Sequence, residues 1–126
     1  MTHLPLPIII DCDPGHDDAI ALLLAVASPR VELLGVTTCF GNCAVEDATR
    51  NALRILTLAG ETSVPIAQGA SGPLMGTTAL GNYVHGTSGL DGPDIPEPAF
   101  LASELPAVQL IKSLIERSHE PVTLVV

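Results

Sequence analysis

Four aspartates lie close together near the start of a 126-residue sequence: Asp11, Asp13, Asp17 and Asp18. Two like charges about 5 Å apart repel each other by roughly 3 kcal/mol at an effective dielectric constant of about 20. A fold that holds several carboxylates this close must bind a cation or keep some of them protonated. Because carboxylates offer hard oxygen ligands, the segment predicts a calcium or magnesium site and not a zinc or copper site.

A purely structural interpretation of the same segment stays open. The two later aspartates would complement the positive end of a helix dipole, and the two earlier ones would be solvated turn residues. An EF-hand loop is excluded, because the spacing from Asp11 would require Gly at position 16 and Glu at position 22. The sequence has His16 and Leu22 there.

A phosphoaspartate phosphatase is the strongest chemical alternative, because its nucleophile loop also follows an apolar strand and reads Asp-x-Asp. Asp11 would then attack phosphate, and Asp13 would act as acid and base. That family usually has Thr or Val two positions after the second aspartate, where this sequence has Gly15. It also does not usually place two more aspartates in the next turn.

The elements around the acidic segment follow from apolar periodicity and from breaker residues. We expect four strands, three helices and one long segment that is rich in Gly and Pro and lacks periodicity. The strands are expected at 8–10, 31–40, 64–67 and 122–126, and the long segment at 68–98. The first helix begins at Asp17, with apolar positions Ile20, Leu23, Leu24 and Ala27, and the last passes through Val108, Ile111, Leu114 and Ile115. The middle helix, at 45–59, has the inner face Ala48, Ala52, Ile55, Leu56 and Ala59 and a left-handed stop at Gly60.

Strands that alternate with helices predict an α/β fold with an open, doubly wound and mostly parallel sheet. The order of the strands cannot be read from the sequence. In such sheets, ligands bind beyond the carboxyl ends of the strands. Asp13 and Asn42 each follow a predicted strand, so we expect both at that edge.

Composition excludes several classes of function. The net charge is −9 with five Lys and Arg, and the only aromatic residues are one Tyr and two Phe, so a nucleic-acid partner is not expected. No apolar stretch is long enough to cross a bilayer, and the first residues lack a signal-peptide pattern, which predicts a cytoplasmic protein. Three cysteines do not suggest a disulfide framework.

Residues 11–19 (DCDPGHDDA) resemble the signature of the inosine-uridine-preferring nucleoside hydrolases. The resemblance continues through residues 36–42 (VTTCFGN), 49–52 (TRNA) and 84–92 (VHGTSGLDG), in order along essentially the whole chain. Residues 88–93 (SGLDGP) look most like the pyrimidine-preferring bacterial branch. The resemblance implies a Rossmann-like core and hydrolysis of ribonucleosides, pyrimidine nucleosides in particular, to free base and ribose in nucleoside salvage.

The resemblance also implies a calcium ion held by part of the acidic segment. Asp13 matches a calcium ligand that holds the attacking water and takes its proton. Asp18 matches a second calcium ligand. Asp11 is similar to a carboxylate that steadies the site without binding the metal. Calcium orients water but is a weaker Lewis acid than zinc, so a carboxylate base beside it is useful.

Three further residues match positions that contact the nucleoside in the family. Asp17 matches a carboxylate that hydrogen-bonds a ribose hydroxyl, and Asn42 matches an asparagine on the sugar side. His85 matches a histidine that approaches the nucleoside from a mobile loop. Asn42 could also be only a turn residue, and His85 only an exposed loop residue. His16 stands at a variable position of the signature and is expected to be peripheral.

The chain departs from the family in its length. Family members are considerably longer, and the remaining metal and ribose ligands would lie after Val126. Residues 1–126 are therefore expected to be the amino-terminal part of a single nucleoside hydrolase domain that is incomplete at its carboxyl end. We expect this chain alone to be inactive and the full-length form to be a homo-oligomer. A non-catalytic fragment that at most binds calcium stays a further alternative.

Overall fold

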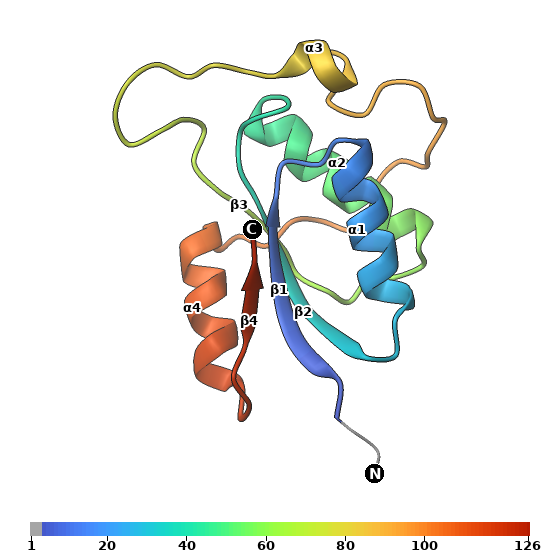
Figure 1. Ribbon diagram of the computed structural model, residues 1–126, viewed down its shortest axis with the longest axis vertical. Coiled ribbons are helices and arrows are strands. Elements are labelled where there is room, and N and C mark those ends of the chain that lie inside the picture. The colour runs from blue at the N-terminus through green and yellow to red at the C-terminus, as the bar shows by residue number, and fades with distance from the viewer. Residues whose placement is uncertain (1–3) are drawn as a thin grey trace.

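The computed structural model describes residues 4–126, which fold into a four-stranded parallel sheet with helices on both faces. The elements in chain order are β1 (Leu6–Cys12), α1 (His16–Ala27), β2 (Val31–Thr38), α2 (Val45–Leu58), β3 (Ile66–Gln68), α3 (Asn82–His85), α4 (Ala107–Arg117) and β4 (Thr123–Val125). Figure 1 shows the sheet at the centre and the segment that carries α3 passing over one end of it. The predicted α/β fold with a parallel sheet is confirmed.

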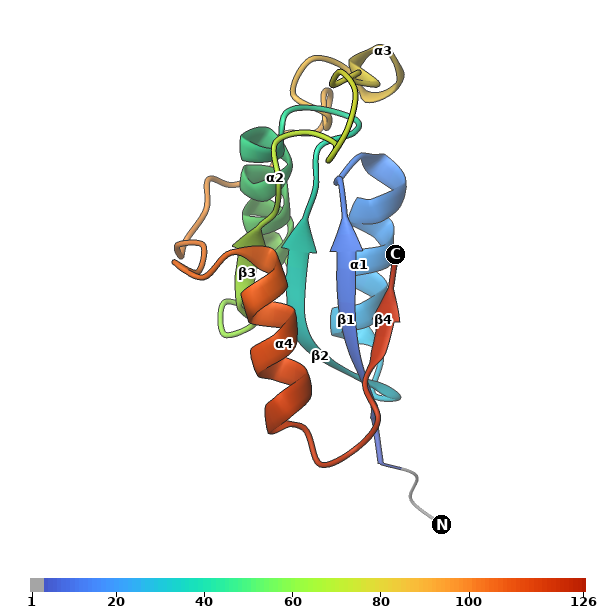
Figure 2. The same ribbon diagram turned by 90° about the vertical axis from the view of Figure 1, so that its left-hand side faces the viewer.

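The sheet is held by the apolar run that precedes the acidic segment. Ile8, Ile9 and Ile10 are all buried, and Ile10 pairs with Val36 of β2 on one side and with Val125 of β4 on the other. The helices α1 and α2 pack on one face, and α4 covers the opposite face (Figure 2). Gly35 allows α4 to approach, because a Cβ there would lie 2.5 Å from Cδ1 of Leu114.

The order of the strands, β3-β2-β1-β4, identifies where a ligand site is expected. The chain adds β2 and β3 successively on one side of β1 and then returns to add β4 on the other side. Open α/β sheets bind ligands beyond the carboxyl ends of the strands at such a reversal, which here lies at β1. Asp13 follows β1 directly and therefore lies at this position.

The predicted helix is confirmed as α1, but of its four predicted apolar positions only Leu23 packs against the core. Ile20 and Leu24 are 66% and 67% exposed, whereas Leu22 and Ala25 are buried. The helix is apolar almost all around, so its periodicity does not select a face. In α4 the predicted position Val108 is also exposed, and the buried residues are Ala107 and Leu110.

Other boundaries shift by a few residues, and one element was not predicted. The strand expected to reach residue 40 ends at Thr38, and β1 continues through Asp11 to Cys12. The long segment 68–98 contains the four-residue helix α3, which is too short to leave a periodic signal. The inner face of α2 and the left-handed Gly60, with a φ of 73°, are confirmed. Within residues 4–126, no helix is both long and apolar enough to cross a membrane.

Candidate functional site

Asp13 and Asn42 are brought together by the loops that follow β1 and β2. The backbone N–H of Asn42 donates to Oδ2 of Asp13 at 2.7 Å, and its side-chain amide donates to the backbone carbonyl of Asp13 at 2.8 Å. Gly41 makes this approach possible, because a Cβ at that position would overlap the Asp13 carboxylate. The glycine of the predicted Gly-Asn turn is thus needed for contact with Asp13, and Asn42 is both a turn residue and a part of the site.

Asp18 returns to Asp13 from the first turn of α1. Its Oδ2 accepts the backbone N–H of Asp13 at 3.2 Å, so the two carboxyl groups that the sequence predicts as metal ligands are neighbours. Burial raises the pKa of Asp18, and the nearby charges of Asp17 and Asp13 raise it further. The raised pKa reflects the crowding of carboxylates from which a cation site was predicted.

Asp11 lies inside β1 and not in the turn. Its Oδ1 accepts the hydroxyl of Thr37, the residue it pairs with in β2, at 2.6 Å. Its neighbour Cys12 points into the core, and its thiol donates to the Thr37 carbonyl at 3.8 Å. Asp11 is thus hydrogen-bonded within the sheet, two residues before Asp13. This position is compatible with the predicted role of a carboxylate that steadies the site without binding the metal.

His85, the last residue of α3, lies against the start of α1. Its Nε2 is 3.5 Å from Oδ1 of Asp17, and a Cβ on Gly15 would lie 2.7 Å from the same nitrogen. The structure therefore brings His85 to the acidic segment instead of leaving it as an isolated loop residue. His16, expected to be peripheral, also contacts His85: their Nδ1 atoms are 2.9 Å apart.

Two residues that sequence reasoning did not single out hold the loop in place. The buried Asn51 of α2 donates from Nδ2 to the carbonyls of Pro14, at 3.3 Å, and Ser88, at 2.7 Å, and so ties the acidic segment to the α3 loop. Asp91 accepts hydrogen bonds from the backbone and hydroxyl of Ser88, which lower its pKa. Asn51 belongs to the quoted TRNA motif, but no pattern in one sequence distinguishes it from a surface helix residue.

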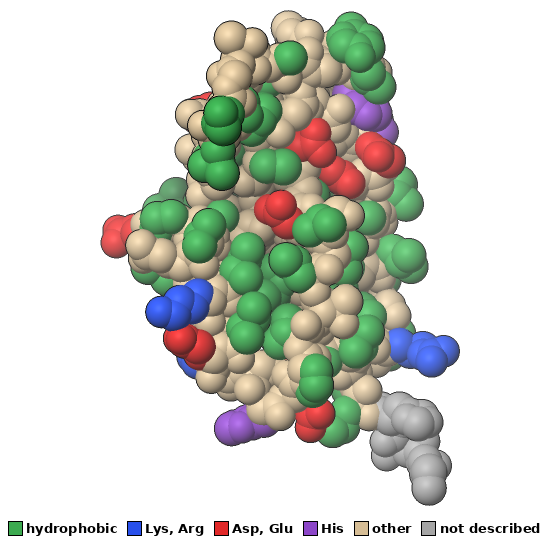
Figure 3. All heavy atoms as spheres, turned by 60° about the vertical axis from the view of Figure 1, so that its left-hand side comes forward, with side chains coloured by type: hydrophobic (Ala, Val, Ile, Leu, Met, Phe, Trp, Pro, Cys, Tyr) green, Lys and Arg blue, Asp and Glu red, His purple; other side chains and the backbone are tan. Residues whose placement is uncertain are grey.

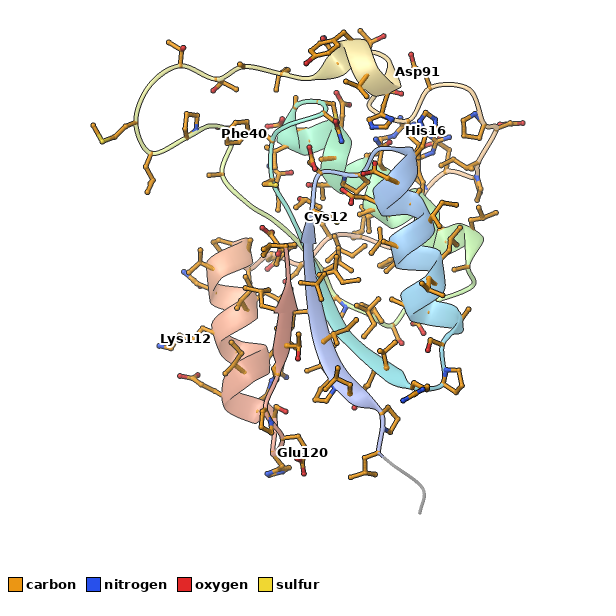
Figure 4. All side chains as sticks on the ribbon, viewed as in Figure 1. Cys12, His16, Phe40, Asp91, Lys112 and Glu120 are labelled. Atoms are coloured by element: carbon orange, nitrogen blue, oxygen red, sulfur yellow. The ribbon has the colours of Figure 1, made fainter. Side chains whose placement is uncertain are left out.

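The acidic and histidine side chains form one group at the end of the molecule where β1 and β2 finish. Figure 3 shows acidic side chains gathered near a histidine at that end. Figure 4 places His16 and Asp91 together there, above Cys12 at the end of β1. A hollow of about 770 Å³ lies at the other end of the sheet, lined by residues such as Pro7, Leu34, Leu114 and His119, and none of the predicted site residues lines it.

The donors present fit a hard divalent cation, but only in part. Asp13 and Asp18 offer carboxylates from neighbouring positions, and burial and the charges of Asp17 and Asp13 raise the pKa of Asp18. Within residues 4–126, no group of three or more His, Cys, Asp or Glu side chains converges on one point. Calcium takes six to eight oxygen ligands, so most of its shell would come from water or from protein outside these residues.

The cysteines are free thiols, as their number suggested. Cys12 and Cys43 are buried, and Cys39 is partly exposed. Burial raises the pKa of Cys39 to about 11, and the charges of Asp11, Asp13 and Asp18 contribute to the rise. Thiols this basic are poor nucleophiles and poor metal ligands at neutral pH, so the chemistry of the site rests on its carboxylates and histidines.

Comparison with known proteins shows the family to which the chain is similar. The family described as inosine-uridine preferring nucleoside hydrolase matches residues 8–126. The chain is 50% identical over 122 residues to the pyrimidine-specific ribonucleoside hydrolase RihA of Escherichia coli O127:H6, covering 97% of this chain and 39% of the relative. It is 55% identical over 119 residues to RihA of Photobacterium profundum, covering 94% and 38%.

Solved structures show the same fold. A purine-preferring ribonucleoside hydrolase from Gardnerella vaginalis superimposes with a TM-score of 0.85 at 30% identity, covering 94% of this chain and 39% of that one. A plant nucleoside hydrolase superimposes with a TM-score of 0.81 at 33% identity, covering 95% and 38%. The chain therefore spans about two-fifths of the length of the relatives it matches.

Proposed function

Because the chain belongs to the inosine-uridine preferring nucleoside hydrolase family, we propose that the protein hydrolyses the N-glycosidic bond of ribonucleosides to free base and ribose. Pyrimidine nucleosides are the proposed preference, since relatives at 50% and 55% identity are pyrimidine-specific hydrolases. The purine-preferring structural relative is more distant in sequence, at 30% identity. The chain covers 39% of its relatives, so the activity is proposed for the protein that contains it.

The observation that carries the proposal is the meeting of Asp13, Asp18 and Asn42 at the point where the strand order reverses. Asp13, in the loop after β1, is hydrogen-bonded both to Asn42, in the loop after β2, and to Asp18, in the first turn of α1. This edge is where an α/β sheet binds its ligand. Two of the three residues are carboxylates, and burial together with the charges of Asp17 and Asp13 raises the pKa of Asp18. A solvated turn would not need the hydrogen bonds that hold them together.

We assign Asp13 as the base. The N–H of Asn42 engages Oδ2 of Asp13 and fixes the carboxylate, which leaves Oδ1 to take the proton of the attacking water. Calcium, when bound by Asp13 and Asp18, would supply positive charge that orients this water and the ribose hydroxyls. The carboxylate of Asp17 is 77% exposed and free to accept a ribose hydroxyl. Its negative charge would also favour the oxocarbenium character that ribose gains as the bond breaks.

The phosphatase alternative receives less support. Its nucleophile would be Asp11, but that residue lies within β1 and its Oδ1 accepts the Thr37 hydroxyl at 2.6 Å. A carboxylate that is hydrogen-bonded to the neighbouring strand is poorly placed to attack a ligand beyond the strand ends. The family match favours nucleoside hydrolysis as well. The alternative of a non-catalytic calcium-binding fragment is decided by the assay below.

The test measures sugar and phosphate release by the full-length product of the gene. We expect reducing sugar from uridine and cytidine, less from inosine, and none from any of them after chelation of calcium. Asp13→Ala should abolish release, whereas Asp47→Ala should not, because Asp47 is an exposed residue in the first turn of α2 and is not a proposed ligand. Phosphate release from a generic monoester without sugar release from uridine would overturn the proposal. The cytoplasmic location, the salvage role and the homo-oligomeric state stay predictions.

A further inference from the structure

His16 and His85 come from different elements and face each other through the same ring atom. Nδ1 of His16, at the start of α1, is 2.9 Å from Nδ1 of His85, at the end of α3, and the ring centroids are 5.0 Å apart. Nε2 of His16 is 3.0 Å from the backbone carbonyl of Asp91. His16 therefore contacts both α3 and the loop that follows α3. Figure 4 shows His16 next to Asp91 of that loop.

These contacts determine where the protons lie when both rings are neutral. A carbonyl oxygen only accepts, so Nε2 of His16 must carry its proton. A neutral imidazole has one N–H, which makes Nδ1 of His16 an acceptor. The short Nδ1–Nδ1 contact then requires Nδ1 of His85 to be the donor. The second nitrogen of His85, Nε2, is consequently left without a proton.

The three residues that begin α1 together fix the ring of His85. Gly15 leaves room for it, since a Cβ there would lie 2.7 Å from its Nε2 and 2.8 Å from its Cγ. His16 binds Nδ1 at 2.9 Å, and Asp17 lies 3.5 Å from Nε2, beyond an ordinary hydrogen bond. The shorter contact decides the neutral tautomer in favour of a proton on Nδ1.

We infer that His16 is a positioning residue that holds the His85 ring against Gly15 and keeps Nε2 of His85 available as an acceptor beside the Asp17 carboxylate. The consequence for catalysis rests on the proposed function. Nε2 of His85 and Oδ1 of Asp17 are then two acceptors 3.5 Å apart, suited to two hydroxyl donors of one sugar. Without His16, His85 would place its proton on Nε2, next to Asp17, and one acceptor would be lost.

Two conservative variants separate the contacts of His16. Asn in place of His16 puts an amide oxygen near the position of Nδ1 and keeps the acceptor for His85. Gln puts an amide N–H near the position of Nε2 and keeps only the bond to the Asp91 carbonyl. Long-range proton–nitrogen correlation spectra of the full-length product report which imidazole nitrogen is protonated. They would be recorded at about pH 8.5, above the ordinary histidine pKa of about 6.5.

We expect His85 to carry its proton on Nδ1 in the wild type and in His16→Asn, and on Nε2 in His16→Gln. Protonated Nε2 of His85 in the wild type, or the same tautomer in both variants, would overturn the inference. The spectra need no substrate, so they decide the His16–His85 relation even if the protein releases no sugar. In that case the proposed function fails, while the positioning of His85 by His16 stands or falls on the spectra.

Kinetics then test whether His16 acts through His85. His16→Gln should lower kcat/KM for uridine by about tenfold, which corresponds to 1.4 kcal/mol at 25 °C, and His16→Asn by less. In a His85→Ala background, His16→Gln should cause no further loss. His119→Gln is the matched control, because His119 lines the hollow at the other end of the molecule. Losses from His16→Gln and His85→Ala that simply add would show that His16 does not act through His85.

Discussion

Asp13 takes part in three hydrogen bonds of the candidate site. Its backbone N–H donates to Asp18, and its backbone carbonyl and Oδ2 accept from Asn42. The hydrogen bond to Oδ2 already fixes the Asp13 side chain. Oδ1 is therefore held in one direction, and binding through it costs no further side-chain entropy. This residue is therefore the one whose loss should affect both metal binding and proton transfer.

Calorimetry on the full-length product tests the two proposed metal ligands. Asp13→Ala and Asp18→Ala should each weaken calcium binding by more than ~100-fold, the upper limit of what losing an outer-shell partner costs. Asp47→Ala is the control, because Asp47 is exposed on α2 and should leave the affinity unchanged. Wild-type affinity in both site variants would show that the cation, if any, binds elsewhere.

Cys39 should react slowly with iodoacetamide, although it is partly exposed. Burial and the nearby aspartates raise its pKa to about 11, and a raised thiol pKa lowers the fraction of reactive thiolate. A pKa of about 11 in place of 9.0 lowers the thiolate fraction at pH 8, and with it the alkylation rate, by up to about 100-fold. Mass spectrometry of a tryptic digest measures the rate, with glutathione as the reference thiol. A rate close to that of glutathione would show that the carboxylates do not surround Cys39 as described.

At the scale of elements, the sequence predicts the strands and helices well but not their faces or contacts. The continuous apolar run Ile8–Ile10 is buried as expected. The inner face of α2 has a clear helical period, and its Ala48, Ala52, Ile55 and Leu56 are buried. The apolar surface of α1 runs nearly all around the helix, so Ile20 and Leu22 could not be told apart. The contact of His16 with His85 joins residues that only the fold brings together, and no local pattern predicts it.

The turn after β2 offers a test that separates the site from the stability of the fold. Gly41→Ala places a methyl group on the Asp13 carboxylate and should weaken calcium binding by about tenfold or more. Gly60→Ala is the counterpart, since Gly60 has open space around it but a φ of 73°. It should lower the free energy of unfolding by about 1 kcal/mol and leave calcium affinity unchanged. Equal calcium affinity in the two variants would show that Gly41 has no role in placing Asp13.

The segment that carries α3 is expected to act as a lid that becomes ordered over the nucleoside. None of the residues of α3 is buried, and Tyr83 is almost fully exposed. Its amides should therefore exchange rapidly in the free protein and more slowly when a ribose-like inhibitor binds. Hydrogen exchange followed by mass spectrometry measures this, with the buried core of α2 as an internal reference. Unchanged exchange around His85 would make it a surface residue without a part in closure.

At the scale of the whole molecule, two apolar surfaces stay uncovered within residues 4–126. Leu124 and Val125 of β4 are 45% and 43% exposed at the edge of the sheet, and α1 presents Ile20 and Leu24 to solvent. An unpaired parallel strand and an apolar helix face both favour association. The relatives that this chain matches are about two and a half times as long, since it covers 39% of their length.

Residues 1–126 expressed alone should therefore associate and should not turn over uridine at a useful rate. Asp13 and Asp18 supply only part of the six to eight oxygens of a calcium shell, so the affinity for the metal should be weak. Ribose would also lose positioning contacts, and accurate placement contributes several kcal/mol to lowering the barrier. Sugar release from uridine in excess calcium is the measurement, with circular dichroism to show that the helices form. Turnover comparable to that of a full-length family enzyme would show that these residues hold a complete site.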